Sequence, residues 1–341
     1  AVIHMPLIDE SESKLDSGLM QALKDNFGFS DGLIIDSSGN SWQLWRCDEI
    51  DAWWRLFEEI IDAPMGRKLA NAGCDEEEYL LQNGQLDFVG LFSRKKAFKA
   101  MKSRWLMHGW GDPDHKSNSF ITRSLNPLIA GLMQAQLERI NGERYRMRWE
   151  QKSYGSCFLS LEKSNNTIPD SKKIGSQYKS DEGLNIEVEY GWKIDGVDYH
   201  MLASGIFLRL QNFCGGLTAN LSEDDRLCWP DLDDGFISIA SASKELFING
   251  EEIFLAADAD GWKDSCNSIL GSRGLGSPLS VSTIDDKGGV QLIFKDLPTP
   301  SIVTGMLAGM WVRCEGRPVK VSLECDDDQT IITLQCKYEI G

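Results

Sequence analysis

The sequence lacks long apolar runs and is short of positive charge. No stretch of its 341 residues approaches the roughly 18 consecutive apolar residues that a membrane-spanning helix needs, so we expect no membrane insertion. Its 35 lysines and arginines are outnumbered by 52 acidic residues, which gives a net charge of −17. Because like charges repel, this balance argues against nucleic acids and anionic membrane surfaces as main partners.

Basic residues gather in one place, the run SRKKAFKAMKSR at 93–104. Phe98 and Met101 lie within it at helical spacing, which indicates an amphipathic helix. A solvated helix face explains this run better than a nucleic-acid footprint does.

Several enzyme motifs are also missing. The sequence has no phosphate-binding P-loop, no HExxH zinc motif and no dinucleotide-binding fingerprint after a predicted strand. The glycine-rich stretch at 271–278 follows a predicted helix, which makes it a weak phosphate loop. Glu150 and Glu324 end predicted strands, where a lone carboxylate is usually structural rather than an acid or base. We predict no catalytic residue and lean toward a protein that is not an enzyme.

Cysteine pairs of the CxxC type are absent too, although nine cysteines are scattered along the chain. Their odd number and irregular spacing favour reduced thiols over a disulfide framework. The first residues, AVIHMPLIDESESK, have neither the basic start nor the apolar centre of a secretory leader. We therefore predict a cytoplasmic protein.

What the sequence does contain is a repeat. Residues 125–140 place apolar side chains at the spacing of an amphipathic helix, and Gly142 offers the left-handed backbone that ends such a helix. Alternating residues then predict a strand up to Glu150, followed by a turn and a return strand. Residues 300–324 repeat this plan without a gap, which indicates a tandem duplication.

Other segments of the two halves correspond in the same order. The stretch 15–28 resembles 202–215, and GWG at 109–111 has a counterpart in GLG at 274–276. A glycine-turn hairpin is predicted after the second of these motifs, whereas the first half has room only for a shortened hairpin or none.

The length suits two domains of about 150 residues each. We predict an α+β protein made of two related domains, each with helices packed on an antiparallel sheet. The first domain is expected at 1–162 and the second at 184–341. The segment 163–183 is polar and rich in Ser, Asn, Lys and Gly, which is typical of a linker.

The repeated pattern resembles the 4-vinyl reductase domain family. The features that match are a glycine-containing helix closed by a second glycine, an alternating strand ending in Glu, and a hairpin near Cys. In the first half the matching residues are Gly109, Trp110, Gly111, Gly131, Gly142, Glu150, Cys157 and Phe158. In the second half they are Gly276, Gly305, Gly309, Gly316 and Glu324.

The resemblance implies three kinds of function. The family is named for a proposed role in bacteriochlorophyll synthesis, so a tetrapyrrole is a candidate cofactor. Similar domains serve as sensors in aromatic-responsive regulators, and the wider superfamily includes haem-based nitric-oxide sensors. It also includes small subunits of the vesicle-tethering transport-particle complex, which act through protein contacts.

Metal-ligand patterns are incomplete. The family often has Glu-x-x-Cys followed by a second Cys, a set that suits zinc. Here Ser153 stands at the first Cys position, and Ile331 takes the later Cys position in the second half. The polar cluster in HGWGDPDH, with His108, Asp112, Asp114 and His115, is more simply explained as a decorated turn. We predict no metal site.

Tryptophan is abundant, with eleven residues. Large aromatic side chains fill cores, but they also line sites for flat apolar ligands between helices and sheets. We therefore predict that a ligand site is lined by Trp105, Trp110, Phe120, Met133, Trp149, Trp262 and Trp311.

The leading hypothesis is non-catalytic binding of a small apolar or aromatic molecule, for sensing or carrying. One alternative is a tetrapyrrole-modifying enzyme or accessory factor. The other is a scaffold that binds a protein partner or a second copy of itself.

Overall fold

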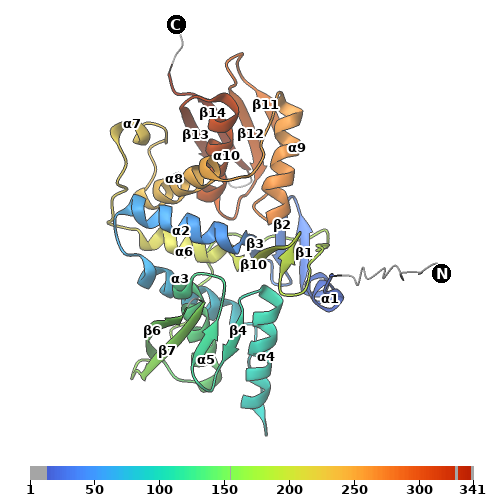
Figure 1. The fold of residues 1–341 in the computed structure, drawn as a ribbon, viewed down its shortest axis with the longest axis vertical. Coiled ribbons are helices and arrows are strands. Elements are labelled where there is room, and N and C mark those ends of the chain that lie inside the picture. Colours follow the sequence, from blue (N-terminus) through green and yellow to red (C-terminus); the bar gives the residue numbers. More distant parts are fainter. Residues whose placement is uncertain (1–13, 154, 327–328, 339–341) are drawn as a thin grey trace, which may run out of the picture.

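The computed structural model describes residues 14–153, 155–326 and 329–338 (Figure 1). It has the predicted α+β architecture, with helices packed on three antiparallel sheets. A six-stranded sheet occupies the middle of the molecule, and a four-stranded sheet lies toward each end of its long axis (Figure 1). None of the helices in these described residues is long and apolar enough to cross a membrane.

Each half of the chain contains the same succession of elements, as the sequence repeat predicts. The first unit comprises α3 (Gly66–Leu81), α4 (Ser93–His108), β4 (Asp112–Asp114), β5 (Ser119–Ile121), α5 (Asn126–Asn141), β6 (Tyr145–Ser153) and β7 (Ser156–Lys163). The second comprises α8 (Asp234–Asn249), α9 (Ala259–Ile269), η1 (Gly271–Arg273), β11 (Ser280–Thr283), β12 (Val290–Lys295), α10 (Pro300–Glu315), β13 (Val319–Cys325) and β14 (Gln329–Cys336). The sheets have matching strand orders, β4-β5-β7-β6 and β11-β12-β14-β13. The β4–β5 hairpin is the shortened one.

The two repeated helices, α5 and α10, have the same ends. Each carries a proline in its first turn and stops at a glycine in the left-handed conformation, Gly142 with φ 66° and Gly316 with φ 64°. A residue with a side chain is strained in that conformation, so the glycine lets the chain turn sharply into the following strand.

A second pair of glycines sets the spacing between helices. Gly131 of α5 lies so close to α3 that a Cβ built on it would be 2.0 Å from the carbonyl oxygen of Ala70. Gly305 of α10 meets α8 in the same way, 2.1 Å from the carbonyl oxygen of Ala240. Gly305 of α10 therefore serves close packing inside its own unit.

The central sheet joins the two halves. The first half supplies α1 (Ser17–Asn26), β1 (Phe27–Ser30), β2 (Leu33–Asp36), β3 (Ser41–Arg46) and α2 (Cys47–Ile61). The middle of the chain supplies β8 (Glu182–Gly183), β9 (Lys193–Ile194), β10 (Val197–Ala203), α6 (Ser204–Phe213) and α7 (Glu223–Arg226). The strand order is β8-β1-β2-β3-β10-β9, and β3 pairs with β10 antiparallel, with Leu44 opposite Met201. Because a helix follows each of these two strands directly, the halves meet in an approximate twofold arrangement.

Each half sends one helix to the other half. Helix α2 packs against α8 of the second unit, where the Trp53 Nε1 donates to the Ser243 Oγ at 3.0 Å. Helix α6 packs against α3 of the first unit, where the Arg209 Nε donates to a Glu76 carboxylate oxygen at 2.8 Å. The two units are therefore held together by exchanged helices as well as by the sheet.

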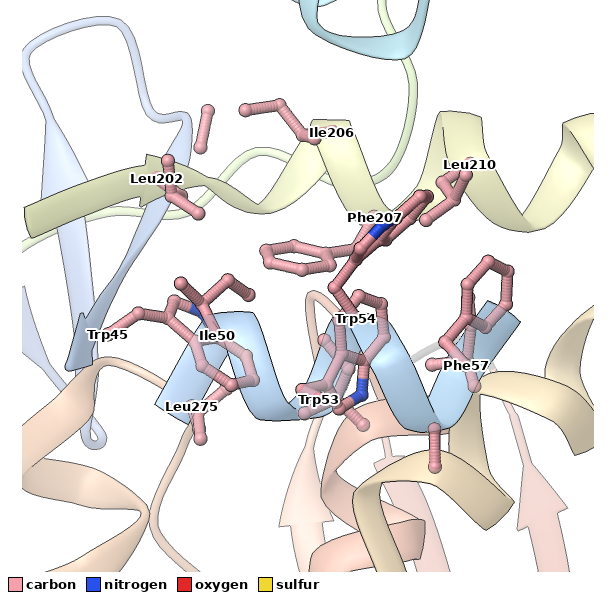
Figure 2. Packing of buried hydrophobic residues seen from close by; sticks show 14 of the residues in the cluster. Trp45, Ile50, Trp53, Trp54, Phe57, Leu202, Ile206, Phe207, Leu210 and Leu275 are labelled. Carbon is pink, nitrogen blue, oxygen red and sulfur yellow. The ribbon is translucent and has the colours of Figure 1, made fainter. Parts of the chain in front are cut away.

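An aromatic cluster fills the space between α2 and α6 (Figure 2). Trp53 stacks on Phe57 at a centroid distance of 5.4 Å, and Phe207 of α6 meets the Trp53 ring edge-on at 5.6 Å. Trp45 of β3 lies 5.5 Å from Phe207. Burial of aromatic rings of this size is a major stabilising contribution, so this cluster anchors the junction between the halves.

The structure changes one predicted correspondence between the halves and describes the predicted linker. The match of 15–28 with 202–215 is wrong as a structural equivalence, because α1 precedes strand β1 whereas α6 follows strand β10. The helix in the position of α6 is α2. The predicted linker, 163–183, is largely exposed but hydrogen-bonded to the rest of the protein: the Tyr178 N–H donates to the Gly39 carbonyl at 2.9 Å, and residues 182–183 form β8.

Candidate functional site

Four of the predicted ligand-binding residues are buried in the core of the first unit, and three of them contact each other. The Trp105 ring is 6.4 Å from that of Trp110 and 5.8 Å from that of Phe120. All three side chains are buried, as is Met133 of α5. Trp105 and Trp110 donate hydrogen bonds to the Gln136 side chain and to a backbone carbonyl, respectively.

The other three are separate from this cluster and from each other. Trp149 is half-buried beneath the Arg67 guanidinium, 4.6 Å from the ring centroid. Trp262 packs edge-on against Phe254, and the Trp311 Nε1 donates to the Gly288 carbonyl at 2.8 Å. None of the seven predicted residues lines the grooves described below.

The histidines and acids of HGWGDPDH do not converge. His115 stacks on Phe98, Asp112 pairs with Lys102, and Asp114 accepts hydrogen bonds from its own turn. Among the described residues, no group of three or more His, Cys, Asp or Glu side chains is arranged to hold a metal ion.

His108 instead fills the space against the central sheet in the first half of the chain. Its ring lies between Trp42 and Trp110, at centroid distances of 4.5 and 4.6 Å, and its Nδ1 donates to the Arg104 carbonyl at 2.8 Å. Burial, reinforced by the nearby Arg104 charge, lowers the pKa of His108 well below its usual range. The imidazole is therefore neutral and acts as a flat packing group.

The duplication places a different pair of residues at the corresponding point of the second half. Gly109 lies against the Tyr199 carbonyl, and Gly274 lies against the Trp42 carbonyl. Because Trp42 and Tyr199 stand at the same distance before the helices that follow β3 and β10, the two contacts are equivalent. The residue before each glycine then corresponds as well, so Arg273 takes the place of His108.

In the second half, the position next to Tyr199 and Arg273 is an open groove, which is not filled by side chains. It has a volume of about 670 Å³ and an apolar floor on the face of the central sheet. The apolar lining consists of Phe29, Leu44, Leu184, Ile186, Ile194 and Tyr199. The polar lining consists of Glu182, Asn185, Glu187, Asp195, Glu252, Ser268, Ser272 and Arg273.

Arg273 closes one end of the groove. Its Nη1 donates to both Glu49 carboxylate oxygens at 2.7 and 2.8 Å, and its Nη2 donates to Glu252 at 3.0 Å. Burial alone would lower the pKa of Arg273, but the two carboxylates outweigh it and raise that pKa. The guanidinium is therefore protonated and fixed in position, and its charge is balanced by Glu49 and Glu252.

A second groove, of about 500 Å³, begins on the other side of Arg273. Glu252 and Arg273 line both grooves. The second groove runs between α2 and the end of α8, and its lining includes Arg46, Arg55, Leu56 and Phe247. Arg273 and its two glutamates therefore form the boundary between two neighbouring spaces.

The first of these grooves is acidic apart from Arg273. Glu182, Glu187 and Asp195 are exposed on its rim and form no ion pair with any described residue. Burial raises the pKa of Tyr199, so its hydroxyl stays protonated and is a hydrogen-bond donor at neutral pH. Such a lining suits a molecule with an apolar body and a positively charged or donor group.

A thiol–imidazole pair occupies the middle of the molecule. The Cys47 Sγ lies 3.4 Å from the His200 Nδ1, and in the equivalent place the Gln43 Nε2 donates to the Ser204 Oγ at 3.1 Å. Burial raises the pKa of Cys47 to about 12 and lowers that of His200 to about 3. Both groups are neutral at pH 7, so the pair does not supply a reactive thiolate.

Sequence reasoning missed a GxSxG pattern at Gly28–Gly32. Ser30 ends β1, and the chain turns directly into β2 through Asp31 and Gly32, both at positive φ. A nucleophile elbow needs a strand followed by a helix, and the Ser30 hydroxyl instead donates to the Asp181 carboxylate. The pattern belongs to a hairpin turn.

Tyr199, Glu252 and Arg273 were also missed. The signal that could have found Arg273 is the GWG/GLG correspondence read one residue upstream, where His and Arg differ in chemistry. Tyr199 has no such local signal, because its equivalence to Trp42 depends on strand pairing across the halves.

Comparison with known proteins gives no match. No protein-family model, no curated protein and no solved structure is significantly similar to this chain.

Proposed function

We propose that the protein binds a small molecule with an apolar or aromatic body in the groove between the central sheet, residues 182–195 and Arg273. The binding is non-catalytic and serves sensing or carrying. The acidic rim favours a ligand that presents a positive charge or hydrogen-bond donors outward.

One observation carries the proposal. In the first half, Trp42 and His108 fill the space against the sheet, whereas in the second half Tyr199 and Arg273 leave a groove of about 670 Å³ at the corresponding place. The same position is filled by side chains in one half and is an open groove in the other. The groove is therefore not required for the packing of this fold. The volume is in the range of small-molecule sites in proteins.

The floor supports the same proposal. Phe29, Leu44 and Tyr199 offer aromatic and aliphatic surface side by side on neighbouring or nearby strands. The groove lining contains serines but no histidine or cysteine, the side chains that most often activate or provide a nucleophile. This lining favours binding over catalysis.

Filling the groove tests the proposal. The substitution Tyr199→Trp gives the second half the residue that the first half has at Trp42, and it leaves the Arg273 ion pairs intact. We expect ligands found in a thermal-shift screen of small cationic aromatic compounds to bind Tyr199→Trp at least about tenfold more weakly, because the added ring occupies their space.

The matched control is Tyr190→Trp, which makes the same change at a side chain that is 65% exposed and outside the groove lining. It should bind as the unmodified protein does. Equal affinity for all three proteins would contradict the proposal.

The tetrapyrrole alternative and the scaffold alternative stay predictions from the resemblance. A tetrapyrrole would be revealed by an absorbance scan of the purified protein.

A further inference from the structure

Helix α4 and the loop before it form a surface that the groove does not explain. Val89, Leu91 and Phe92 are 96%, 89% and 74% exposed at the tip of that loop. Three such large apolar side chains in a row of four residues are unusual on a protein surface and point to an interaction site. The tip lies at one end of the molecule's long axis, below α4 (Figure 1).

The backbone holds these side chains outward. Gly90 has φ 94° and no atom within 4 Å of a Cβ built on it, so the tip has no neighbours there. Phe92 has φ 70°, a left-handed conformation that costs a residue with a side chain about 1 kcal/mol or more. With 74% of its surface exposed, Phe92 gains little from packing within the chain.

Positively charged side chains follow the apolar tip on helix α4. Helix α4 carries Arg94, Lys95, Lys96, Lys99, Lys102 and Arg104 and no acidic residue. Arg104 is buried in an ion pair with Glu77, and Lys102 pairs with Asp112. Lys95, Lys96 and Lys99 are exposed and form no ion pair with any described residue.

We propose that this end of the molecule docks on an anionic lipid membrane, with Val89, Leu91 and Phe92 entering the headgroup region and the α4 lysines contacting lipid phosphates. The binding is peripheral, because only the apolar tip enters the headgroup region. It is independent of the ligand groove, because none of the groove-lining residues belongs to α4 or to the loop before it.

The arrangement fits a membrane because the apolar residues protrude. The exposed side chains of the tip can enter a fluid lipid layer, and Phe92 also lines a largely apolar groove of about 1000 Å³ beside Lys95, Lys96 and Lys99. The lysines of residues 95–99 follow within about 6 Å of helix axis, a depth similar to that of the headgroup layer. Each lysine near an anionic surface contributes about 1 kcal/mol.

The net charge of −17 led us to expect repulsion from anionic surfaces, and the charge distribution changes that expectation. At physiological ionic strength charges are screened beyond about 8 Å, so the acidic second half, at the far end of the molecule, acts weakly on a surface at α4. The local charge of α4 decides the interaction.

The duplication supplies a matched comparison. The loop from α8 to α9 is the counterpart of the loop from α3 to α4, and it also exposes apolar residues, Ile253 at 83% and Leu255 at 80%. It is flanked by Glu251, Glu252, Asp258 and Asp260. This loop has the apolar component of the surface without the cationic one.

Vesicle co-sedimentation tests the proposal. We expect the protein to bind phosphatidylcholine vesicles containing about one-third phosphatidylserine at least about tenfold more tightly than vesicles of phosphatidylcholine alone. The double substitution Leu91→Ser with Phe92→Asn should weaken binding to both at least about tenfold, since asparagine tolerates the left-handed backbone at position 92.

Replacing Lys95, Lys96 and Lys99 with Gln should weaken binding to the anionic vesicles at least about tenfold and leave binding to neutral vesicles unchanged. The control Ile253→Ser with Leu255→Ser should bind as the unmodified protein does. Circular dichroism melts confirm that each variant is folded.

The proposal is overturned if the protein binds neither vesicle type, or binds both equally. It is also overturned if the Leu91/Phe92 variant binds normally. Loss of a dimer in that variant, without vesicle binding by the parent protein, would assign the surface to a second copy of the chain.

Discussion

At the residue scale, three consecutive glutamates of α3 organise the first unit. Glu76 pairs with Arg209 of α6, Glu77 with Arg104 of α4, and Glu78 lies near Arg144, the residue just before β6. Each carboxylate is nearly fully buried and meets an arginine from a different element. The acids therefore specify how helix α3 is oriented, because a rotated helix would leave buried charges unpaired.

Glu78 is the least satisfied of the three. Its oxygens make no hydrogen bond, and the Arg144 Nη1 is 3.8 Å away. Burial, opposed by Arg144, raises the pKa of Glu78 from an ordinary 4.5 to about 7. The folded state holds this proton at pH values where the unfolded chain has lost it, so folding loses stability as the pH rises from about 4.5 through 7.

We predict that Glu78→Gln stabilises the protein at pH 8 by up to about 3 kcal/mol and has little effect at pH 5. Denaturant melts of both proteins at the two pH values provide the measurement. A loss of stability at pH 8 would show that the Arg144 contact outweighs the cost of burying the charge.

At the element scale, the account depends on the glycine crossings of α3 with α5 and of α8 with α10. A side-chain methyl group at position 131 would clash with the Ala70 carbonyl oxygen, which belongs to the backbone and cannot rotate away. The helices would have to move apart, which would loosen the contacts along their length.

We predict that Gly131→Ala lowers the free energy of unfolding by about 2–4 kcal/mol. Gly18→Ala is the control, because Gly18 lies in an exposed helix where a Cβ would meet only the Asp16 carboxylate at 3.5 Å. The control should change stability by no more than about 1 kcal/mol. Equal effects of the two substitutions would contradict the interpretation that Gly131 is needed for the close contact between α3 and α5.

These elements are also what the sequence could predict. A period of 3.6, a terminal glycine and a period of two are local signals, and they correctly gave α5, α10 and the strands that follow. The correspondence of α1 with α6 failed because a short helix of similar composition carries no information about its neighbours. The ligand site was out of reach for a similar reason, since Tyr199 and Arg273 meet only through the pairing of β3 with β10 and the return of residues 271–276 to that sheet.

At the scale of the whole molecule, the exchanged helices make the halves interdependent. The second unit packs against α2, and the Arg273 side chain pairs with Glu49 of that same helix. The predicted boundary between two domains at 163–183 therefore separates the repeats in sequence, while their packing crosses it.

We predict that residues 164–341 produced alone do not give a cooperative thermal transition, because Trp45 and Trp53, which pack against Phe207, are missing from their core. Co-production with residues 1–163 should restore a stable complex that elutes with the intact protein in size-exclusion chromatography. A monomeric, cooperatively melting fragment would contradict this view of the assembly.

The central claim is that the second half keeps open the space that the first half fills. Native mass spectrometry tests it most directly, applied to the parent protein and to Tyr199→Trp after both have been incubated with the same small-molecule extract. The account predicts one retained small molecule per chain in the parent protein and none in Tyr199→Trp. Retention of the same mass by both proteins, or by neither, would contradict it.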